Sequence, residues 1–133
     1  MRIQSLLTAA LLTTRLMAGT APSAWAATEA PFTQPAFAAA QQQDKPILVD
    51  ITASWCPTCA KQRPILAQLE KDPAFKDLQV YTVDFDTQKD VVRAMGAQMQ
   101  STLVVFRGKD EKGRSAGDTA PASIRALLEK VNR

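Results

Sequence analysis

The stretch Trp55-Cys56-Pro57-Thr58-Cys59 holds both cysteines of the 133-residue chain and follows an apolar, β-branched run over residues 46–53. Such a run with a single acid inside it is typical of a central strand that is buried on both faces. The sequence therefore predicts a helix that begins at the cysteines, with both sulfurs in its first turn. Unpaired backbone N–H groups and the positive end of the helix dipole favour a thiolate at Cys56 in that position.

The chemistry that needs two such thiols is disulfide exchange, in which Cys56 attacks a substrate disulfide and Cys59 resolves the mixed disulfide. Three other interpretations compete with it. A structural zinc site needs about four N or S ligands, whereas this chain has two cysteines and no histidine. A purely structural disulfide across so short a loop would remove little unfolded-state entropy. Two inert free thiols do not suit an exported chain, which the N-terminus indicates this is.

The N-terminal residues 1–26 differ in composition from the rest of the chain. Arg2 precedes an apolar segment over residues 3–12, and Ala24-Trp25-Ala26 has the small-x-small pattern of a signal-peptidase site. We therefore expect residues 1–26 to be a signal peptide, residues 27–133 to form the mature domain, and the protein to be periplasmic or otherwise exported. Arg15 interrupts the apolar region, so an uncleaved anchor is the alternative, although the segment is well short of the ~20 residues that span a bilayer.

The composition favours one soluble globular domain without a nucleic-acid partner. Of the residues, 46% are apolar and 22% are charged, with 16 basic against 13 acidic side chains. Removal of residues 1–26 takes away Arg2 and Arg15 but no acid, so the mature domain is close to neutral. The chain also lacks a run of Lys or Arg with interleaved aromatics, which is the pattern expected of nucleic-acid contacts.

Hydrophobic periodicity predicts the order helix, strand, helix, strand, helix, strand, strand, helix, after an extended lead-in over residues 28–35. The expected ranges are a helix over 36–43, a strand over 46–53, a helix from 56 to about 71, a strand over 78–85, a helix over 88–95, strands over 102–106 and 113–116, and a last helix with Ile124, Leu127, Leu128 and Val131 inward. One right-handed crossover and a closing hairpin then give a three-layer α/β domain, with a central mixed sheet of about four strands between helices.

The strand before the cysteines ends in Ala53-Ser54-Trp55-Cys56, and Pro64 follows Cys59 by five residues. Together with the order of elements, these residues resemble the thioredoxin superfamily over nearly the whole mature chain. The resemblance implies a thioredoxin-like fold and a thiol-disulfide oxidoreductase that uses Cys56 and Cys59. It implies protein substrates and no small cofactor or metal, and we expect a monomer.

Asp50 lies six residues before Cys56, inside the predicted strand. The resemblance implies that this carboxylate is buried and helps to move the proton on and off the resolving thiol. The residue pattern agrees, because burial raises the pKa of a carboxyl group toward the range of a general base near neutral pH. The alternative is an ordinary solvated aspartate at the end of a strand.

The chain departs from the family pattern at Ser101. Thioredoxins place a cis-proline directly before the Thr-Leu of the third strand, and here that position is Ser101 in Gln100-Ser101-Thr102-Leu103. A non-proline cis peptide costs ~3 kcal/mol, so the sequence leaves a trans peptide and a strained cis peptide both open. The resemblance also assigns a substrate-binding surface, whose residues would be Trp55, Pro57, Thr58, Gln100, Ser101, Thr102 and Gly117.

The dipeptide between the cysteines is a second departure. Pro57-Thr58 replaces the Gly-Pro of thioredoxins and the Pro-His of the periplasmic DsbA-type oxidants. Without a histidine beside Cys56, we expect less thiolate stabilisation than in the DsbA type and hence a weaker oxidant.

These features make the leading hypothesis an exported thiol-disulfide oxidoreductase for protein disulfides and dithiols. It would act as a reductant or electron relay rather than a primary oxidant. Resemblance suggests that a membrane electron-transfer protein of the DsbD kind resets it. The alternative is a thioredoxin-fold binding module, or a protein that handles zinc or copper with its two thiolates.

Overall fold

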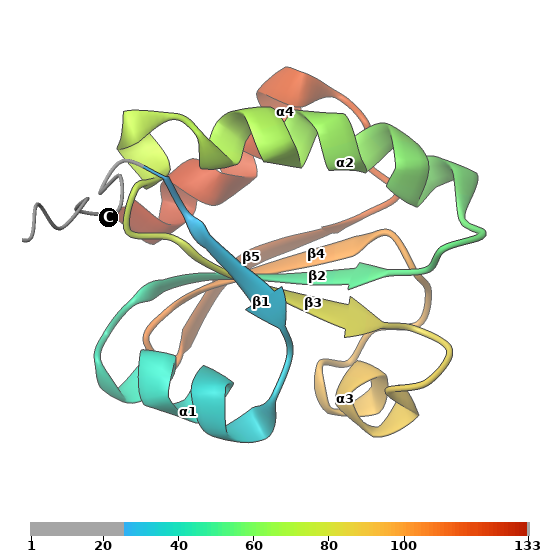
Figure 1. Ribbon diagram of the computed structural model, residues 1–133, viewed down its shortest axis with the longest axis horizontal. Coiled ribbons are helices and arrows are strands. Elements are labelled where there is room, and N and C mark those ends of the chain that lie inside the picture. The colour runs from blue at the N-terminus through green and yellow to red at the C-terminus, as the bar shows by residue number, and fades with distance from the viewer. Residues whose placement is uncertain (1–25, 133) are drawn as a thin grey trace, which may run out of the picture.

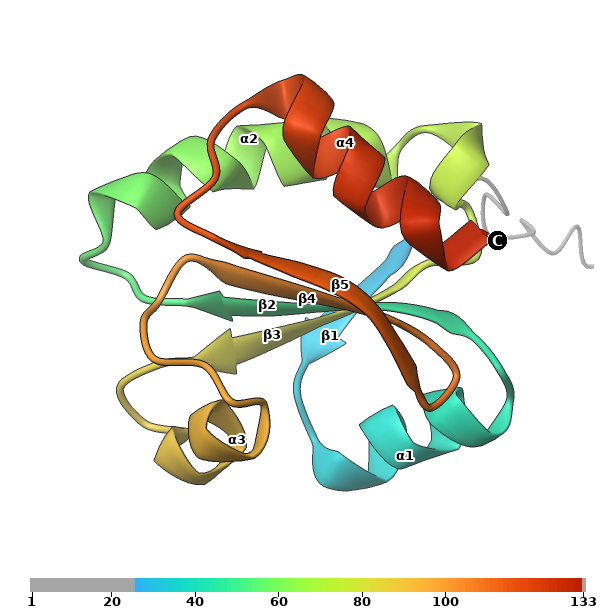
Figure 2. The same ribbon diagram turned by 180° about the vertical axis from the view of Figure 1, so that it is seen from behind.

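The computed structural model describes residues 26–132, which form a sheet between two layers of helices. The strands are β1 (Thr28–Pro31), β2 (Pro46–Thr52), β3 (Gln79–Asp84), β4 (Thr102–Arg107) and β5 (Asp110–Ala116). The helices are α1 (Gln34–Gln42), α2 (Pro57–Glu70), α3 (Lys89–Ala94) and α4 (Pro121–Glu129), with short 3-10 turns at Pro73–Phe75 and Lys130–Asn132. Helices α2 and α4 cover one face of the sheet, and α1 and α3 cover the other (Figures 1 and 2).

The sheet has five strands in the order β1-β3-β2-β4-β5, with β2 at its centre. Strand β2 pairs parallel to β3 and antiparallel to β4, and β5 closes an antiparallel hairpin with β4. The predicted three-layer fold, the parallel crossover and the closing hairpin are thus confirmed.

The predicted number of strands was too low by one. Residues 28–35 were expected to be an extended lead-in, but Thr28–Pro31 pairs parallel with β3 at the edge of the sheet. This strand is only four residues long and mostly exposed, with the sequence TEAP. So short and polar a segment carries no alternating pattern, and an edge strand can keep a proline because one of its sides needs no ladder partner.

The closing hairpin is also tighter than expected. The sequence predicted a turn over residues 107–112, whereas β4 ends at Arg107 and β5 already begins at Asp110. Gly108 makes this turn possible, since its φ is +54° and a Cβ there would lie 2.7 Å from Asp44 Oδ1.

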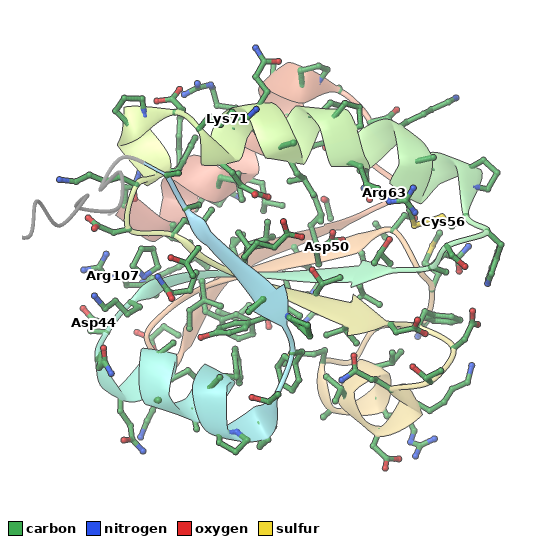
Figure 3. The ribbon with its side chains drawn as sticks, in the orientation of Figure 1. Asp44, Asp50, Cys56, Arg63, Lys71 and Arg107 are labelled. Carbon is green, nitrogen blue, oxygen red and sulfur yellow. A yellow bond between two sulfur atoms is a disulfide. The ribbon has the colours of Figure 1, made fainter. Side chains whose placement is uncertain are left out.

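Strand β2 separates two apolar cores. Because successive strand residues point to opposite faces, Ile47, Val49 and Ile51 pack on the side of α1 and α3. Leu48 packs on the other side, in a core that includes Ile124, Leu127 and Leu128 of α4. The same alternation places Asp50 on the α2 side of the sheet, where Figure 3 shows its side chain.

Within residues 26–132, no helix is both long enough and apolar enough to cross a membrane.

Candidate active site

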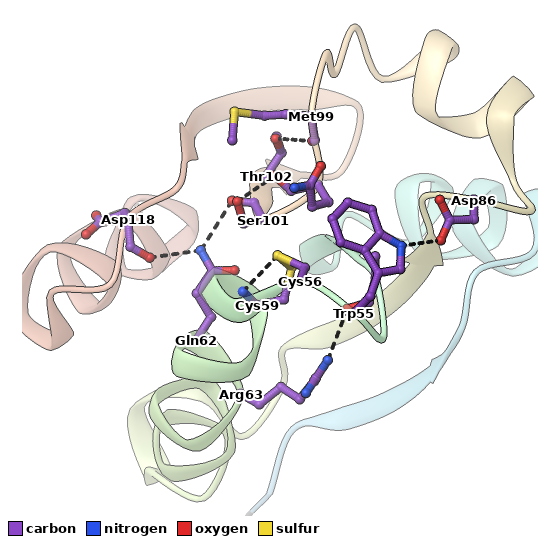
Figure 4. The surroundings of a disulfide bond; sticks show 12 residues. Trp55, Cys56, Cys59, Gln62, Arg63, Asp86, Met99, Ser101, Thr102 and Asp118 are labelled. Atoms are coloured by element: carbon purple, nitrogen blue, oxygen red, sulfur yellow. Dashed lines mark hydrogen bonds between the residues drawn. A yellow bond between two sulfur atoms is a disulfide. The ribbon is translucent and has the colours of Figure 1, made fainter.

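The two cysteines lie where the central strand gives way to helix α2. Cys56 is the N-cap residue of this helix, and its Sγ accepts a hydrogen bond of 3.1 Å from the backbone N–H of Cys59. A disulfide joins the two residues, whose Cα atoms are 5.3 Å apart (Figure 4). The predicted placement of both sulfurs at the start of a helix is confirmed. The backbone N–H group at Cys56 Sγ is a donor that can stabilise a thiolate at this sulfur.

Burial does not distinguish the attacking cysteine from the resolving one. The exposed fractions of Cys56 and Cys59 are 2% and 1%. What differs is the environment of each sulfur, because only Cys56 caps the helix and receives its N–H. The assignment of attack to Cys56 and of resolution to Cys59 therefore rests on electrostatics and stays a prediction.

Ser101 lies in the loop beside the disulfide (Figure 4), and its side chain is fully buried. No cis peptide occurs among residues 26–132, so the bond before Ser101 is trans, which decides between the two alternatives that the sequence left open. Ser101 adopts a φ of +58°, in the left-handed region that favours glycine. Its carbonyl oxygen accepts hydrogen bonds from Gly117 N at 2.9 Å and from Gln62 Nε2 at 3.2 Å.

The residues predicted to bind substrate lie on two segments that meet at the disulfide. Trp55 is 57% exposed and its indole N–H donates to Asp86 Oδ2 at 2.7 Å. Pro57 is exposed, while Thr58 and Gln100 are half-buried.

The side chains of Ser101 and Thr102 are turned inward, and the hydroxyl of Thr102 donates to Met99 O at 2.8 Å. Any substrate contact of these two residues would therefore involve backbone atoms. Gly117 reaches the site only through its backbone bond to Ser101. Substrate binding by the predicted set stays a prediction.

Sequence reasoning missed Met99, which lies next to this loop. Met99 and Trp55 are the exposed large apolar side chains of residues 26–132, and both lie near the disulfide (Figure 4). Exposed apolar side chains that gather at one place mark contact surfaces for other proteins, and methionine adapts to varied partners. A single methionine before a strand carries no sequence signal for such a role.

Asp50 is the predicted proton carrier, and its pKa is raised from 3.8 to about 6. Burial is the main cause, the nearby Glu29 carboxylate adds to the rise, and the Arg63 guanidinium opposes it. Glu70 shares this environment, and burial together with Glu29 and Asp50 raises its pKa to about 7. Among the described residues Asp50 forms no hydrogen bond to a cysteine, so its transfer of a proton to Cys59 would need a bridging water and stays a prediction.

The raised pKa of Asp50 predicts that Asp50→Asn stabilises the fold at high pH. A rise from 3.8 to about 6 corresponds to about 3 kcal/mol in favour of the protonated form. The folded protein is therefore penalised as pH rises from about 4 to about 6, and the full penalty applies above that range. Urea unfolding should show Asp50→Asn to be more stable than wild type by up to about 3 kcal/mol at pH 8, and by little at pH 4.

The matched control for this prediction is Asp77→Asn, at an exposed position. It should change stability equally little at both pH values. A gain for Asp50→Asn that does not depend on pH would contradict the assigned ionisation.

The side chains of residues 26–132 contain no group of three or more His, Cys, Asp or Glu that could hold a metal ion.

A disulfide at the first turn of a helix that follows the central strand of this sheet defines a thiol-disulfide oxidoreductase of the thioredoxin fold. The sequence model of the family described as Thioredoxin matches residues 28–130. The chain therefore belongs to the thioredoxin family.

Relatives in several organisms have similar sequences or structures. A thioredoxin H-type of Brassica campestris is 33% identical over 92 residues, which are 69% of this chain and 72% of that protein. A thioredoxin of Mycobacterium bovis is 31% identical over 88 residues, which are 66% of this chain and 75% of that protein. The crystal structure of Trxlp from Edwardsiella tarda EIB202 superposes with a TM-score of 0.73 at 40% identity, covering 76% of this chain and 97% of that one.

Proposed function

We propose that this thioredoxin-family oxidoreductase is exported and works there as a reductant or electron relay for protein disulfides. The direction of electron flow is inferred from the environment of Cys56, which stabilises a thiolate only weakly. Its sulfur accepts one backbone N–H, from Cys59, and the chain has no histidine that could add an imidazolium. A less stabilised thiolate makes the disulfide form less oxidising.

The surface around the disulfide supports proteins as substrates. Thioredoxins reduce protein disulfides, and this chain exposes Trp55 and Met99 beside its own disulfide. The hydrogen bond from Trp55 to Asp86 holds the indole in one orientation while most of the ring stays accessible. Exposed apolar side chains beside the disulfide suit an extended segment of another protein better than a small polar thiol.

Export is supported by the N-terminal sequence and by the first backbone contact of the described chain. The N–H of Ala27 donates to Glu70 O at 2.9 Å, at the end of α2. Cleavage after Ala26 would turn this group into the N-terminal ammonium. A positive charge is favourable at the C-terminal end of a helix, so the fold can accept the new terminus at this position.

An exported reductant needs a supply of electrons, because the compartments outside the cytosol are oxidising. A membrane electron-transfer protein of the DsbD kind would meet this need, and we include such a partner in the proposal.

The redox potential tests the direction of electron flow. Equilibration with glutathione or dithiothreitol, followed by thiol trapping, should give a redox potential of about -270 mV, as for thioredoxin. A value of about -120 mV, as for DsbA, would identify an oxidant and overturn the proposal.

Intact-mass measurement on exported protein tests whether the N-terminal segment is cleaved. We expect a chain that begins at Ala27 in the soluble fraction. A mass that retains residues 1–26, in a membrane fraction, would instead show an anchored protein.

A further inference from the structure

Gln62 is a fully buried polar residue next to the cysteines. Only 1% of its surface is exposed, and it follows Cys59 by three positions in α2. Residues three apart lie on the same face of a helix, and helical side chains lean toward the N-terminus. The Gln62 side chain therefore lies over the turn that contains Cys59, as Figure 4 shows.

The amide nitrogen of Gln62 has two partners. It donates to Ser101 O at 3.2 Å and to Asp118 O at 2.8 Å. Both partners are carbonyl oxygens, so a flipped amide would set oxygen against oxygen, and the orientation of the group is determined.

The amide oxygen of Gln62, in contrast, is buried and has no donor among the described residues. In Figure 4 it lies on the side of the cysteine pair, away from Asp118. A buried carbonyl oxygen without a donor is costly, and such groups in native proteins call for an explanation. The disulfide form offers no donor from the sulfurs, since neither carries a hydrogen.

We propose that Gln62 is a positioning residue of the redox centre, whose amide oxygen accepts the S–H of Cys59 in the dithiol form. Its amide nitrogen keeps the Ser101 and Asp118 segments packed against α2 in both forms. The unpartnered oxygen of the disulfide form thus gains its donor when the disulfide is reduced. The inference rests on the Cys56–Cys59 couple alone, and neither export nor the direction of electron flow enters it.

A dithiol donor supplies the electrons and protons for the reduction step. The S–S bond between Cys56 and Cys59 breaks as the donor's two thiols form a disulfide, and the two electrons and two protons of those thiols pass to the cysteines. One of these protons resides on Cys59, where its S–H points to the Gln62 oxygen. A hydrogen bond that exists only in the reduced form favours reduction.

Replacement Gln62→Met keeps the length of the side chain but removes the acceptor. The equilibrium constant for reduction by dithiothreitol should fall by about tenfold, as expected for the loss of one buried hydrogen bond. A tenfold change makes the potential more negative by about 30 mV. In urea, the unfolding equilibrium of the reduced form should shift by about tenfold more than that of the oxidised form.

Gln68→Met is the matched control, because it makes the same change at an exposed position of α2. It should leave the potential and the difference between the two forms unchanged. A purely structural Gln62 would make Gln62→Met weaken both forms equally and leave the potential unchanged, and this result would overturn the proposal. The comparison between variants does not depend on the absolute potential, which tests the proposed function.

An infrared measurement avoids any dependence on whether Gln62→Met folds. In Cys56→Ala the only thiol is that of Cys59, since the chain has two cysteines, and alanine adds no competing acceptor at position 56. Its S–H stretch should lie below that of an alkyl thiol in an apolar solvent, as a hydrogen-bonded thiol requires. A band at the position of the free thiol would show that the Gln62 oxygen does not accept this proton.

Discussion

Replacement of Cys56 by serine should abolish disulfide exchange, so that insulin is reduced no faster than by dithiothreitol alone. Exchange begins with attack by a thiolate, and a serine hydroxyl stays protonated and cannot form a disulfide. The backbone N–H of Cys59 and the start of α2 stabilise a thiolate at position 56 and at no other sulfur. Ser54→Ala, an exposed change close to the cysteines, is the control and should keep the wild-type rate.

The complementary variant Cys59→Ser should accumulate mixed disulfides with protein substrates. Attack by Cys56 proceeds, but no second thiol is present to release the substrate. Non-reducing gels after thiol trapping would show the adducts, and dithiothreitol should cleave them by reducing the mixed disulfide. Adducts with Cys56→Ser and none with Cys59→Ser would reverse the two roles.

Replacement of Ser101 by proline should destabilise the fold strongly, although proline is the usual residue of the family at this position. Ser101 has a φ of +58° after a trans peptide and is fully buried, whereas proline holds φ near −65°. The change would force the loop away from Gly117 and Gln62, which bind the Ser101 carbonyl. We expect a loss of about 3 kcal/mol in the free energy of unfolding.

Ser101→Gly separates the backbone effect from the loss of the hydroxyl. Glycine adopts a positive φ without steric cost, so this variant should stay within about 1 kcal/mol of wild type. Thermal and urea unfolding of both variants measure the difference. A proline form as stable as wild type, or more stable, would mean that the loop takes the cis conformation of the family and not the trans conformation of this structure.

Local patterns in the sequence were sufficient for the main features of the fold and of the redox centre. The run from Pro46 to Thr52 is apolar on both faces and became the central strand, because only a strand between two cores can bury both of its sides. The spacing of Ile124, Leu127 and Leu128 matched one face of α4, and all three are buried. Two cysteines at a strand–helix junction placed the disulfide at the N-terminus of α2.

Other features depended on contacts between distant parts of the chain, which no local pattern records. Strand β1 forms only because β3, some fifty residues later, offers an open edge. Gln62 is polar and lies in a helix with little apolar pattern, so its burial follows from carbonyl oxygens 39 and 56 residues away. The positive φ of Ser101 is likewise seen only in the structure, where its carbonyl oxygen accepts hydrogen bonds from Gly117 N and Gln62 Nε2.

The sequence by itself therefore determined the fold class and the reacting atoms, since periodicity and the spacing of two cysteines are properties of short segments. Only the tertiary structure decided what surrounds those atoms: the burial and the Glu29 carboxylate that raise the pKa of Asp50, the exposed side chains of Trp55 and Met99, and the buried amide of Gln62. The physical reason is that burial, charge and hydrogen-bond satisfaction are set by neighbours in space, and at this site those neighbours come from segments far apart in the chain.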